Sequence, residues 1–193
     1  MPDVNNLAEL AERVRGCRAC AGALPMEPRP VFQVSPTARL LIASQAPGTR
    51  VQESGIPFSD ASGDRLRDWM GVDTATFYNA RDMAILPMGF CYPGKAKGGD
   101  APPRRECAEL WRGDLLAGMP GIRLTLLVGT YAQIDALGPG RMTERVRHFS
   151  DYLPLYFPLP HPSWRSAIWA RRNPWFEAEI LPALKHEVRR ALA

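Results

Sequence analysis

Two short segments carry side chains that suit catalysis. Ser44-Gln45-Ala46-Pro47-Gly48 follows one apolar run, and Pro160-His161-Pro162-Ser163 follows another near the end of the chain. A histidine between two prolines sits in a rigid loop, where its ring can donate a hydrogen bond to an oxygen that gains negative charge. Read alone, each segment is also compatible with an ordinary Pro-Gly or His-Pro turn.

The four cysteines form a second candidate site. Cys17 and Cys20 make a C-x₂-C pair, and Cys91 and Cys107 follow 70 residues later, separated by fifteen residues. In C-x₂-C two thiolates can reach the same ion or cluster without strain. The spacing predicts a four-cysteine metal site, and it does not separate zinc from iron–sulfur. The alternative is that Cys91 and Cys107 are buried thiols unrelated to the pair.

The elements that position these residues follow from the apolar pattern. Four runs bounded by Gly or Pro predict buried strands at 39–44, 83–86, 123–128 and 155–159. Helical periodicity is present near 6–15, 62–70, 104–117, 130–137, 142–149 and 174–192. Strands that alternate with helices predict a mainly parallel sheet covered on both faces. Ligands bind beyond the carboxyl ends of such strands, so the Gln45 and His161 loops should face each other across one cleft.

The bulk composition fits a single soluble domain. The 193 residues are 46% apolar and 23% charged, which is enough to bury a sizeable core. The net charge of +4 permits a polyanionic partner without requiring one. No apolar stretch approaches the ~20 residues that span a bilayer, and the first residues lack a secretory pattern. We therefore expect a cytoplasmic protein whose thiols stay reduced.

Taken in order, these motifs resemble the uracil-DNA glycosylase superfamily, and specifically its family 4, the iron–sulfur members. The resemblance runs from Leu7 to about Phe176 and includes Gly55-Ile56-Pro57-Phe58 and Leu126-Leu127-Val128-Gly129. It implies a three-layer α/β/α domain around a four-stranded mainly parallel sheet. It also implies a mainly structural [4Fe–4S] cluster on the four cysteines, with zinc as the less favoured ion. The implied activity is hydrolysis of the N-glycosidic bond of uracil, or of another deaminated or damaged base, in DNA.

The resemblance also assigns roles to individual residues. Excision requires the nucleotide to swing out of the duplex into a pocket. His161 matches the histidine that stabilises the departing base, and Phe58 matches the aromatic residue on which the base stacks. Further contacts to the substrate are expected from Ser44, Ala46, Gly48, Gly89 and Ser163.

The sequence departs from family 4 at the residue that activates water. Gln45 stands where the family has Glu, and an amide can orient a water but cannot act as a base. Asp60 and Asp64 are the candidate substitutes, because the 58–64 segment resembles a corresponding stretch of family 5. Asp60 is equally expected to be the N-cap of the helix that follows.

A second departure concerns the choice of base. Family 4 has an Asn shortly before its third cysteine that reads the pyrimidine edge, and the segment 86–91 has no amide side chain. Hypoxanthine, xanthine and altered pyrimidines are therefore candidate substrates beside uracil. Backbone groups near Gly89 remain available to contact the base.

Basic and aromatic residues near the His161 loop are expected to hold DNA. In the family the loop after His-Pro-Ser enters the minor groove, so Trp164 or Arg165 should fill the gap left by the flipped base. Phosphate contacts are expected from the nearby arginines and from more distant basic residues, namely Arg165, Arg171, Arg172, Arg104, Arg105, Lys95 and Lys97.

The resulting hypothesis is a monomeric, monofunctional DNA glycosylase without a lyase step, since the motif loops hold no activated lysine. Its partner is DNA that contains a damaged base. A second hypothesis is a protein that binds uracil-containing or abasic DNA without cutting it, because of the two departures. A third is a redox or electron-transfer protein, which leaves the loops of His161 and Phe58 unexplained.

Overall fold

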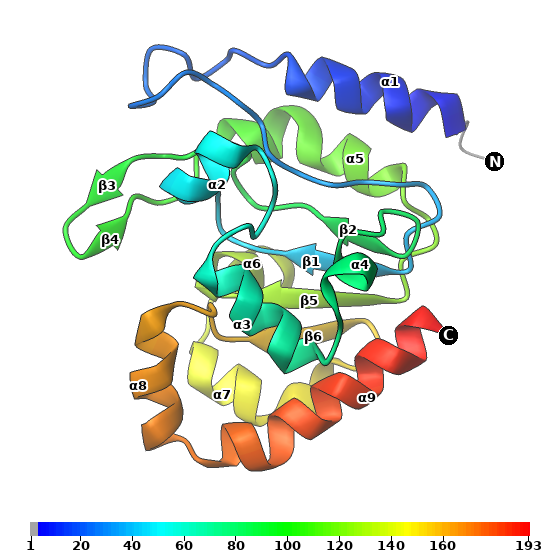
Figure 1. Cartoon of the computed structure of the whole chain (residues 1–193), viewed down its shortest axis with the longest axis vertical. Helices are drawn as coiled ribbons and strands as arrows, with labels where there is room; N and C mark the ends of the chain where they lie inside the picture. Colours follow the sequence, from blue (N-terminus) through cyan, green and yellow to red (C-terminus); the bar gives the residue numbers. More distant parts are fainter. Residues whose placement is uncertain (1–3) are drawn as a thin grey trace.

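The computed structural model describes residues 4–193 and contains a central sheet of four parallel strands (Figure 1). Its strands lie in the order β2-β1-β5-β6. Their bounds are β1 Leu40–Ala43, β2 Met83–Ile85, β5 Leu124–Val128 and β6 Tyr156–Leu159. Each strand falls inside one of the four apolar runs, and the predicted α/β/α sandwich with a four-stranded parallel sheet is confirmed.

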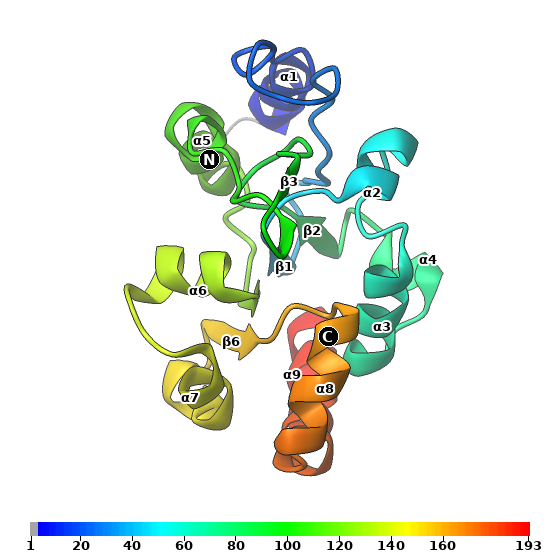
Figure 2. The same cartoon turned by 90° about the vertical axis from the view of Figure 1, so that its left-hand side faces the viewer.

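Helices cover both faces of this sheet. They are α1 (Val4–Arg15), α2 (Thr49–Ser54), α3 (Ala61–Met70), α4 (Thr74–Phe77), α5 (Gly113–Ala117), α6 (Thr130–Leu137), α7 (Met142–Arg147), α8 (Trp164–Arg172) and α9 (Leu181–Leu192). Wide, π-type turns precede α5 and α9, at Ala108–Arg112 and Phe176–Ile180, and a 3₁₀ turn at Phe149–Tyr152 follows α7. Figure 2 shows α5 and α6 on one side of the sheet and α3, α8 and α9 on the other.

Strand side chains point alternately to the two faces, and this alternation divides the core. Leu40 and Ile42 of β1 are fully buried in a cluster with side chains of α3 and α9. Leu41 of the same strand packs with α1 and α5 on the opposite face, and Ala43 packs with α6. Both faces of β1 are therefore dry, as a parallel sheet requires.

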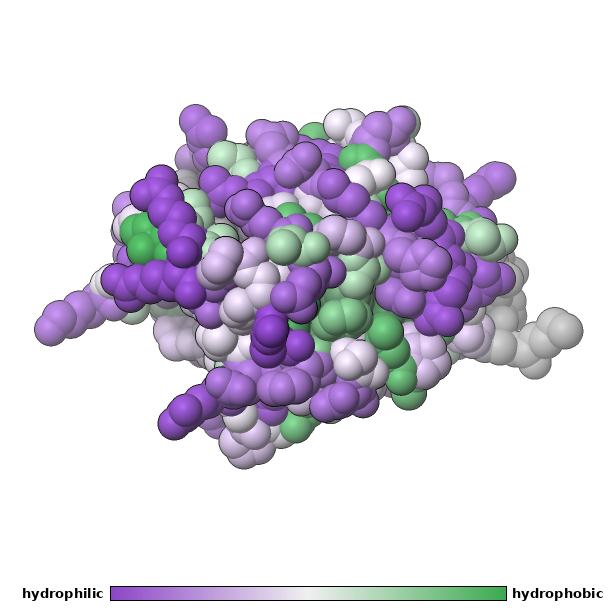
Figure 3. Space-filling view, turned by 90° about the horizontal axis from the view of Figure 1, so that it is seen from below, coloured by the Kyte–Doolittle hydropathy of each residue, from purple (hydrophilic) through white to green (hydrophobic). Residues whose placement is uncertain are grey.

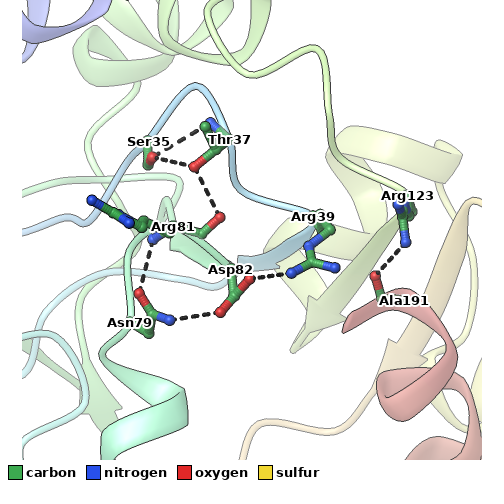
Figure 4. A network of polar contacts seen from close by, with 8 residues as sticks. All are labelled: Ser35, Thr37, Arg39, Asn79, Arg81, Asp82, Arg123 and Ala191. Carbon is green, nitrogen blue, oxygen red and sulfur yellow. Dashed lines mark hydrogen bonds and ion pairs between the residues drawn. The ribbon is translucent and has the colours of Figure 1, made fainter. Parts of the chain in front are cut away.

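The amino ends of the strands are joined by a polar network on the side of the sheet away from the candidate site (Figure 4). Arg39 forms an ion pair of 2.5 Å with Asp82, and the Asn79 amide donates to the same carboxylate at 2.6 Å. Arg123 donates to the carbonyl of Ala191 at 3.3 Å and so ties β5 to α9. These contacts stabilise the amino end of the sheet and do not involve its carboxyl end.

The structure contains elements that the sequence pattern did not predict. They are α2, α4, α8 and a hairpin of two short antiparallel strands, β3 (Lys95–Ala96) and β4 (Gly99–Asp100). The segment after His161 was expected to be a loop, but Trp164 and Arg165 form the first turn of α8. Their contact with the minor groove of DNA stays a prediction. The Ser166 hydroxyl donates back to the Ser163 carbonyl at 2.5 Å, which helps to close the first turn. No helix in the described part of the chain is both long and apolar enough to span a membrane.

Candidate active site

A cavity of about 550 Å³ opens at the carboxyl end of the sheet. The loops after β1, β2 and β6 line it, together with the β3–β4 hairpin and the first turns of α6 and α8. Figure 2 looks onto this end of the molecule. Of the predicted site residues, the cavity brings together Ser44, Gln45, Ala46, Gly48, Phe58, Asp60, His161, Ser163, Trp164 and Arg165. The Gln45 and His161 loops, which are more than a hundred residues apart in sequence, therefore enclose one space.

The His161 ring is desolvated and backed by a glycine. Its Cβ and Cδ2 lie 3.4 and 3.8 Å from the position that a Cβ on Gly129 would occupy, so the end of β5 supports the ring directly. Burial lowers the pKa of His161 below its usual 6.5, and the carboxylates of Asp60 and Asp100 oppose this shift. Burial therefore favours the neutral form of the ring, which can donate one hydrogen bond.

Arg65 of α3 fixes the loop that carries His161. Its guanidinium donates to the carbonyl of Pro162 at 3.3 Å and also to the carbonyl of Ser163. The backbone N–H of Ser163 in turn donates to the His161 carbonyl at 2.8 Å. The sequence analysis did not identify Arg65, because a single arginine on a helix carries no positional signal.

Phe58 has a backbone conformation that is unusual for a residue with a side chain. Its φ is +53°, in the left-handed region, and neighbouring groups hold it there. The Phe58 carbonyl accepts hydrogen bonds from Tyr78 and Arg67, each at 3.3 Å. Gly63 lets this carbonyl approach α3, because a Cβ at that position would lie only 1.7 Å from the Phe58 oxygen. The Phe58 ring packs edge-on against Phe77 and contributes to the cavity wall.

The two candidate acids near Phe58 both have a hydrogen-bond or ion-pair partner. The Asp60 carboxylate accepts a hydrogen bond from the Gly63 N–H at 3.1 Å and caps α3, while the residue also lines the cavity. Asp64 pairs with Arg67 at 2.5 Å on an exposed side of α3 and does not line the cavity. The N-cap prediction for Asp60 is confirmed, and its catalytic role stays a prediction.

Gly89 does not line the cavity. Its N–H donates to the Gln45 carbonyl at 3.0 Å, and a Cβ here would approach Pro103 at 3.0 Å. The adjacent N–H of Met88 donates to the Ser44 carbonyl at 2.8 Å. In the described structure the Gly89 N–H therefore fixes the Gln45 loop and is not directed to a ligand.

The β3–β4 hairpin supplies a wall that sequence analysis missed. Lys97, Gly98, Gly99 and Asp100 all line the cavity. The Arg165 guanidinium donates to the carbonyl of Gly98 and so connects α8 to the hairpin tip. Tyr131 lines the cavity as well, from the start of α6.

The residues predicted to contact DNA are spread along α8. Trp164 is 67% exposed at the mouth of the cavity, and the Arg165 guanidinium lies 5.3 Å from the centre of its ring. Arg171 and Arg172 are exposed in the last turn of α8 and do not line the cavity. Figure 3 shows that the face over the lower helices of Figure 1 is largely hydrophilic. Of the remaining basic residues, Lys95 and Arg105 are exposed, and Arg104 pairs with Glu106.

All four cysteines line a second, small cavity. Burial raises the pKa of Cys91 to about 12 and that of Cys107 to about 11. Two sulfurs accept hydrogen bonds from nitrogen, Cys17 from the Trp111 indole at 3.3 Å and Cys107 from the Phe90 N–H at 3.4 Å. Four thiols are a donor set that suits either an iron–sulfur cluster or a zinc ion. Among residues 4–193, which the structure describes, no group of three or more His, Cys, Asp or Glu side chains is arranged to hold a metal ion.

Gln52 joins the segments that carry these cysteines. It is 3% exposed, its amide donates to the Glu27 carbonyl at 3.1 Å, and its Oε1 accepts from the Tyr92 N–H at 2.9 Å. Glu27 follows the C-x₂-C pair, and Tyr92 follows Cys91 directly. This buried amide therefore holds the two halves of the cysteine site together in the protein itself.

The fold and the cavity define an α/β protein with a candidate ligand site at the carboxyl end of a parallel sheet. A family model of the uracil DNA glycosylase superfamily matches residues 31–185. The chain belongs to this superfamily, and thus to proteins of DNA repair that act on DNA. The match includes the loops of Gln45, Phe58 and His161, whereas Cys17 and Cys20 precede it.

Proposed function

We propose that the protein hydrolyses the N-glycosidic bond between a deaminated or damaged base and the deoxyribose of DNA. The observation that carries this proposal is the single cavity that the Gln45 and His161 loops enclose with Phe58. A base inside a duplex cannot reach such a site, so the target nucleotide must be extruded. Uracil, hypoxanthine, xanthine and altered pyrimidines are the candidate bases, because no amide side chain of the 86–91 segment is present to select a pyrimidine.

His161 and Phe58 have complementary tasks in this reaction. As the glycosidic bond breaks, negative charge grows on the ring of the departing base and on the carbonyl oxygen of that base. A neutral, desolvated imidazole in a rigid loop is a preorganised donor to that oxygen. Phe58 offers an aromatic wall on which the extruded base stacks, and its backbone is held by Tyr78 and Arg67.

We propose that Trp164 and Arg165, which line the cavity, contact DNA at its mouth. Trp164 is exposed beside the cavity and can fill the space that an extruded base leaves in the duplex. Arg171 and Arg172 extend the same helix with positive charge and are suited to phosphate contacts. DNA grip from these side chains does not depend on the sequence of the bases.

We further propose that Cys17, Cys20, Cys91 and Cys107 hold a [4Fe–4S] cluster, as in the iron–sulfur members of family 4. The four thiols share one cavity, and N–H groups point at two of the sulfurs. When bound, the cluster supplies a covalent link between the segment after α1 and the loop after β2. Its role is structural, because the cysteines do not line the base cavity.

The reaction is proposed to stop at the abasic site. Lys97 is the lysine of the cavity wall, and it is exposed on the hairpin. A lysine that attacks the sugar as a free amine is usually one that burial has stripped of its proton. Treatment with borohydride during the reaction should therefore trap no covalent protein–DNA adduct.

Oligonucleotides that contain uracil, hypoxanthine, xanthine or hydroxymethyluracil test the proposal. The wild-type protein should leave an alkali-sensitive site at one or more of these bases, and His161→Ala should lose at least about 100-fold in rate. The second candidate function is binding without excision, which the amide at Gln45 favours. Binding in a gel shift without cleavage of any of the four oligonucleotides would establish that function instead.

A further inference from the structure

Hydrolysis of a glycosidic bond requires a group that takes the proton of the attacking water, and this site has no evident one. Gln45 cannot accept that proton as a base. Asp60 is occupied as the cap of α3, and Asp64 lies outside the cavity. The question is therefore which carboxylate in the cavity is free to act.

Asp100 of the β3–β4 hairpin meets this requirement. It lines the base cavity, and its Oδ2 lies 3.8 Å from the position of a Cβ on Gly48, so the carboxylate lies over the loop that carries Gln45. Within residues 4–193 the Asp100 side chain makes no hydrogen bond or ion pair, whereas Asp60 and Asp64 both have partners. Its charge also reaches His161, whose pKa it raises against the effect of burial.

We propose that Asp100 is the carboxylate that activates the attacking water, in place of the acid that position 45 lacks. This inference rests on the proposed glycosylase function. The carboxylate reaches the Gln45 loop from a different segment of the chain, so the amide of Gln45 orients the water and Asp100 accepts its proton.

The hairpin that carries Asp100 is fixed at both ends. At its base the Ala101 N–H donates to the Gly94 carbonyl at 2.8 Å. The backbone of Lys95 lies opposite that of Asp100 in the antiparallel strand register. At its tip the Arg165 guanidinium donates to the Gly98 carbonyl. Arg165 is thus a positioning residue for Asp100, beside any role in holding DNA.

Glycines let the turn come close to Arg165. Gly98 and Gly99 have φ values of +92° and +156°, and a Cβ on Gly99 would meet the Arg165 guanidinium at 3.4 Å. The charged and titratable groups that share the cavity with Asp100 are Lys97, Arg165, Asp60, Tyr131 and His161.

The chemical step balances with water as the only co-reactant. The bond between C1′ and the base nitrogen breaks, and its electron pair leaves with the base, whose oxygen receives the His161 hydrogen bond. The water oxygen forms a new bond to C1′, and its proton passes to the Asp100 carboxylate. That proton then leaves to the departing base or to solvent, which regenerates the carboxylate and yields a free base and an abasic sugar.

Two isosteric substitutions separate the candidate acids. Asp100→Asn should lower kcat at least about 100-fold on the best base of the panel, with little change in KM. Asp60→Asn keeps a side chain that caps a helix equally well, and it should lower kcat less than about tenfold. Asp68→Asn, on the exposed side of the same helix and outside the cavity, is the matched control with unchanged kcat. Circular dichroism and thermal midpoints verify that each variant is folded.

One further measurement distinguishes proton transfer from a merely structural role. Adding Gln45→Glu to Asp100→Asn should restore at least about tenfold of the lost rate, because both positions approach the same loop.

The outcomes separate the role of Asp100 from the proposed glycosylase function. If the wild type excises a base while Asp100→Asn retains its kcat, Asp100 is not the base and the glycosylase function stands. If Asp60→Asn causes the large loss instead, the assignment moves to Asp60. If the wild type excises none of the bases, the proposed function fails, and the role of Asp100 fails with it.

Discussion

Replacing Gly63 by Ala tests the link between the fold of α3 and the position of Phe58. The new Cβ would lie 1.7 Å from the Phe58 carbonyl oxygen, although real contacts are essentially never below 3.0 Å. The carbonyl must therefore move by more than about 1 Å, away from its hydrogen bonds with Tyr78 and Arg67. Overpacking costs about 1–3 kcal/mol and each lost hydrogen bond about 0.5–1.5 kcal/mol, against a gain of about 0.5–1 kcal/mol for Ala in a helix.

The net expectation for Gly63→Ala is a loss of about 2–4 kcal/mol in the free energy of unfolding, measured in urea. That loss corresponds to a fall in Tm of about 5–15 °C for a chain of this length. Displacement of the stacking ring should also lower kcat/KM about 5- to 150-fold, because base stacking is worth about 1–3 kcal/mol. Gly113→Ala is the matched control, since nothing lies within 4 Å of its new Cβ. A Gly63→Ala protein with the stability and kcat/KM of the wild type would refute this reasoning.

Three further predictions concern His161, Arg65 and the cysteines. Because burial lowers the pKa of His161, the folded state binds a proton less readily, so the free energy of unfolding should fall as the pH drops below 6.5. His161→Gln should flatten that acid-side slope in urea titrations, and an unchanged slope would contradict the prediction. Arg65→Ala should lower kcat at least about tenfold with little change in KM, because charged hydrogen bonds to two carbonyls of the His161 loop are lost. Arg65→Lys should retain part of the kcat that the Ala variant loses. Full activity in the Ala variant would count against the positioning role. Cys91→Ser should abolish absorbance near ~400 nm and lower Tm by more than about 5 °C; a colourless wild type that contains zinc would show that the metal is not iron.

The strands and the meeting of the two loops were predictable for physical reasons. A buried parallel strand is a short apolar run between turn residues, so Leu40–Ala43 and Leu124–Val128 stand out in the sequence. Once the strands are parallel, their carboxyl ends share an edge, and the loops of Gln45 and His161 must lie at the same end of the sheet. The resemblance to a known superfamily added the proposed roles of Phe58 and His161, which periodicity alone does not contain.

The hairpin and its connection to α8 were not predictable from local patterns. The strands of the hairpin are two residues long and exposed, so Lys95–Ala96 and Gly99–Asp100 have no apolar alternation. The contact between Arg165 and Gly98 joins segments 67 residues apart. The helix that begins at Trp164 did have a signal, since Ser163 precedes it in the position of an N-cap.

The central claim is that a DNA base occupies the cavity between Phe58 and His161, and photo-crosslinking tests it most directly. A duplex with a single 5-iodouracil is irradiated with the His161→Ala variant, which should retain the base, and the linked peptide is identified by mass spectrometry. We expect the link on an aromatic residue of the cavity wall, Phe58 or Tyr131. A link confined to peptides that do not line the cavity would contradict the account.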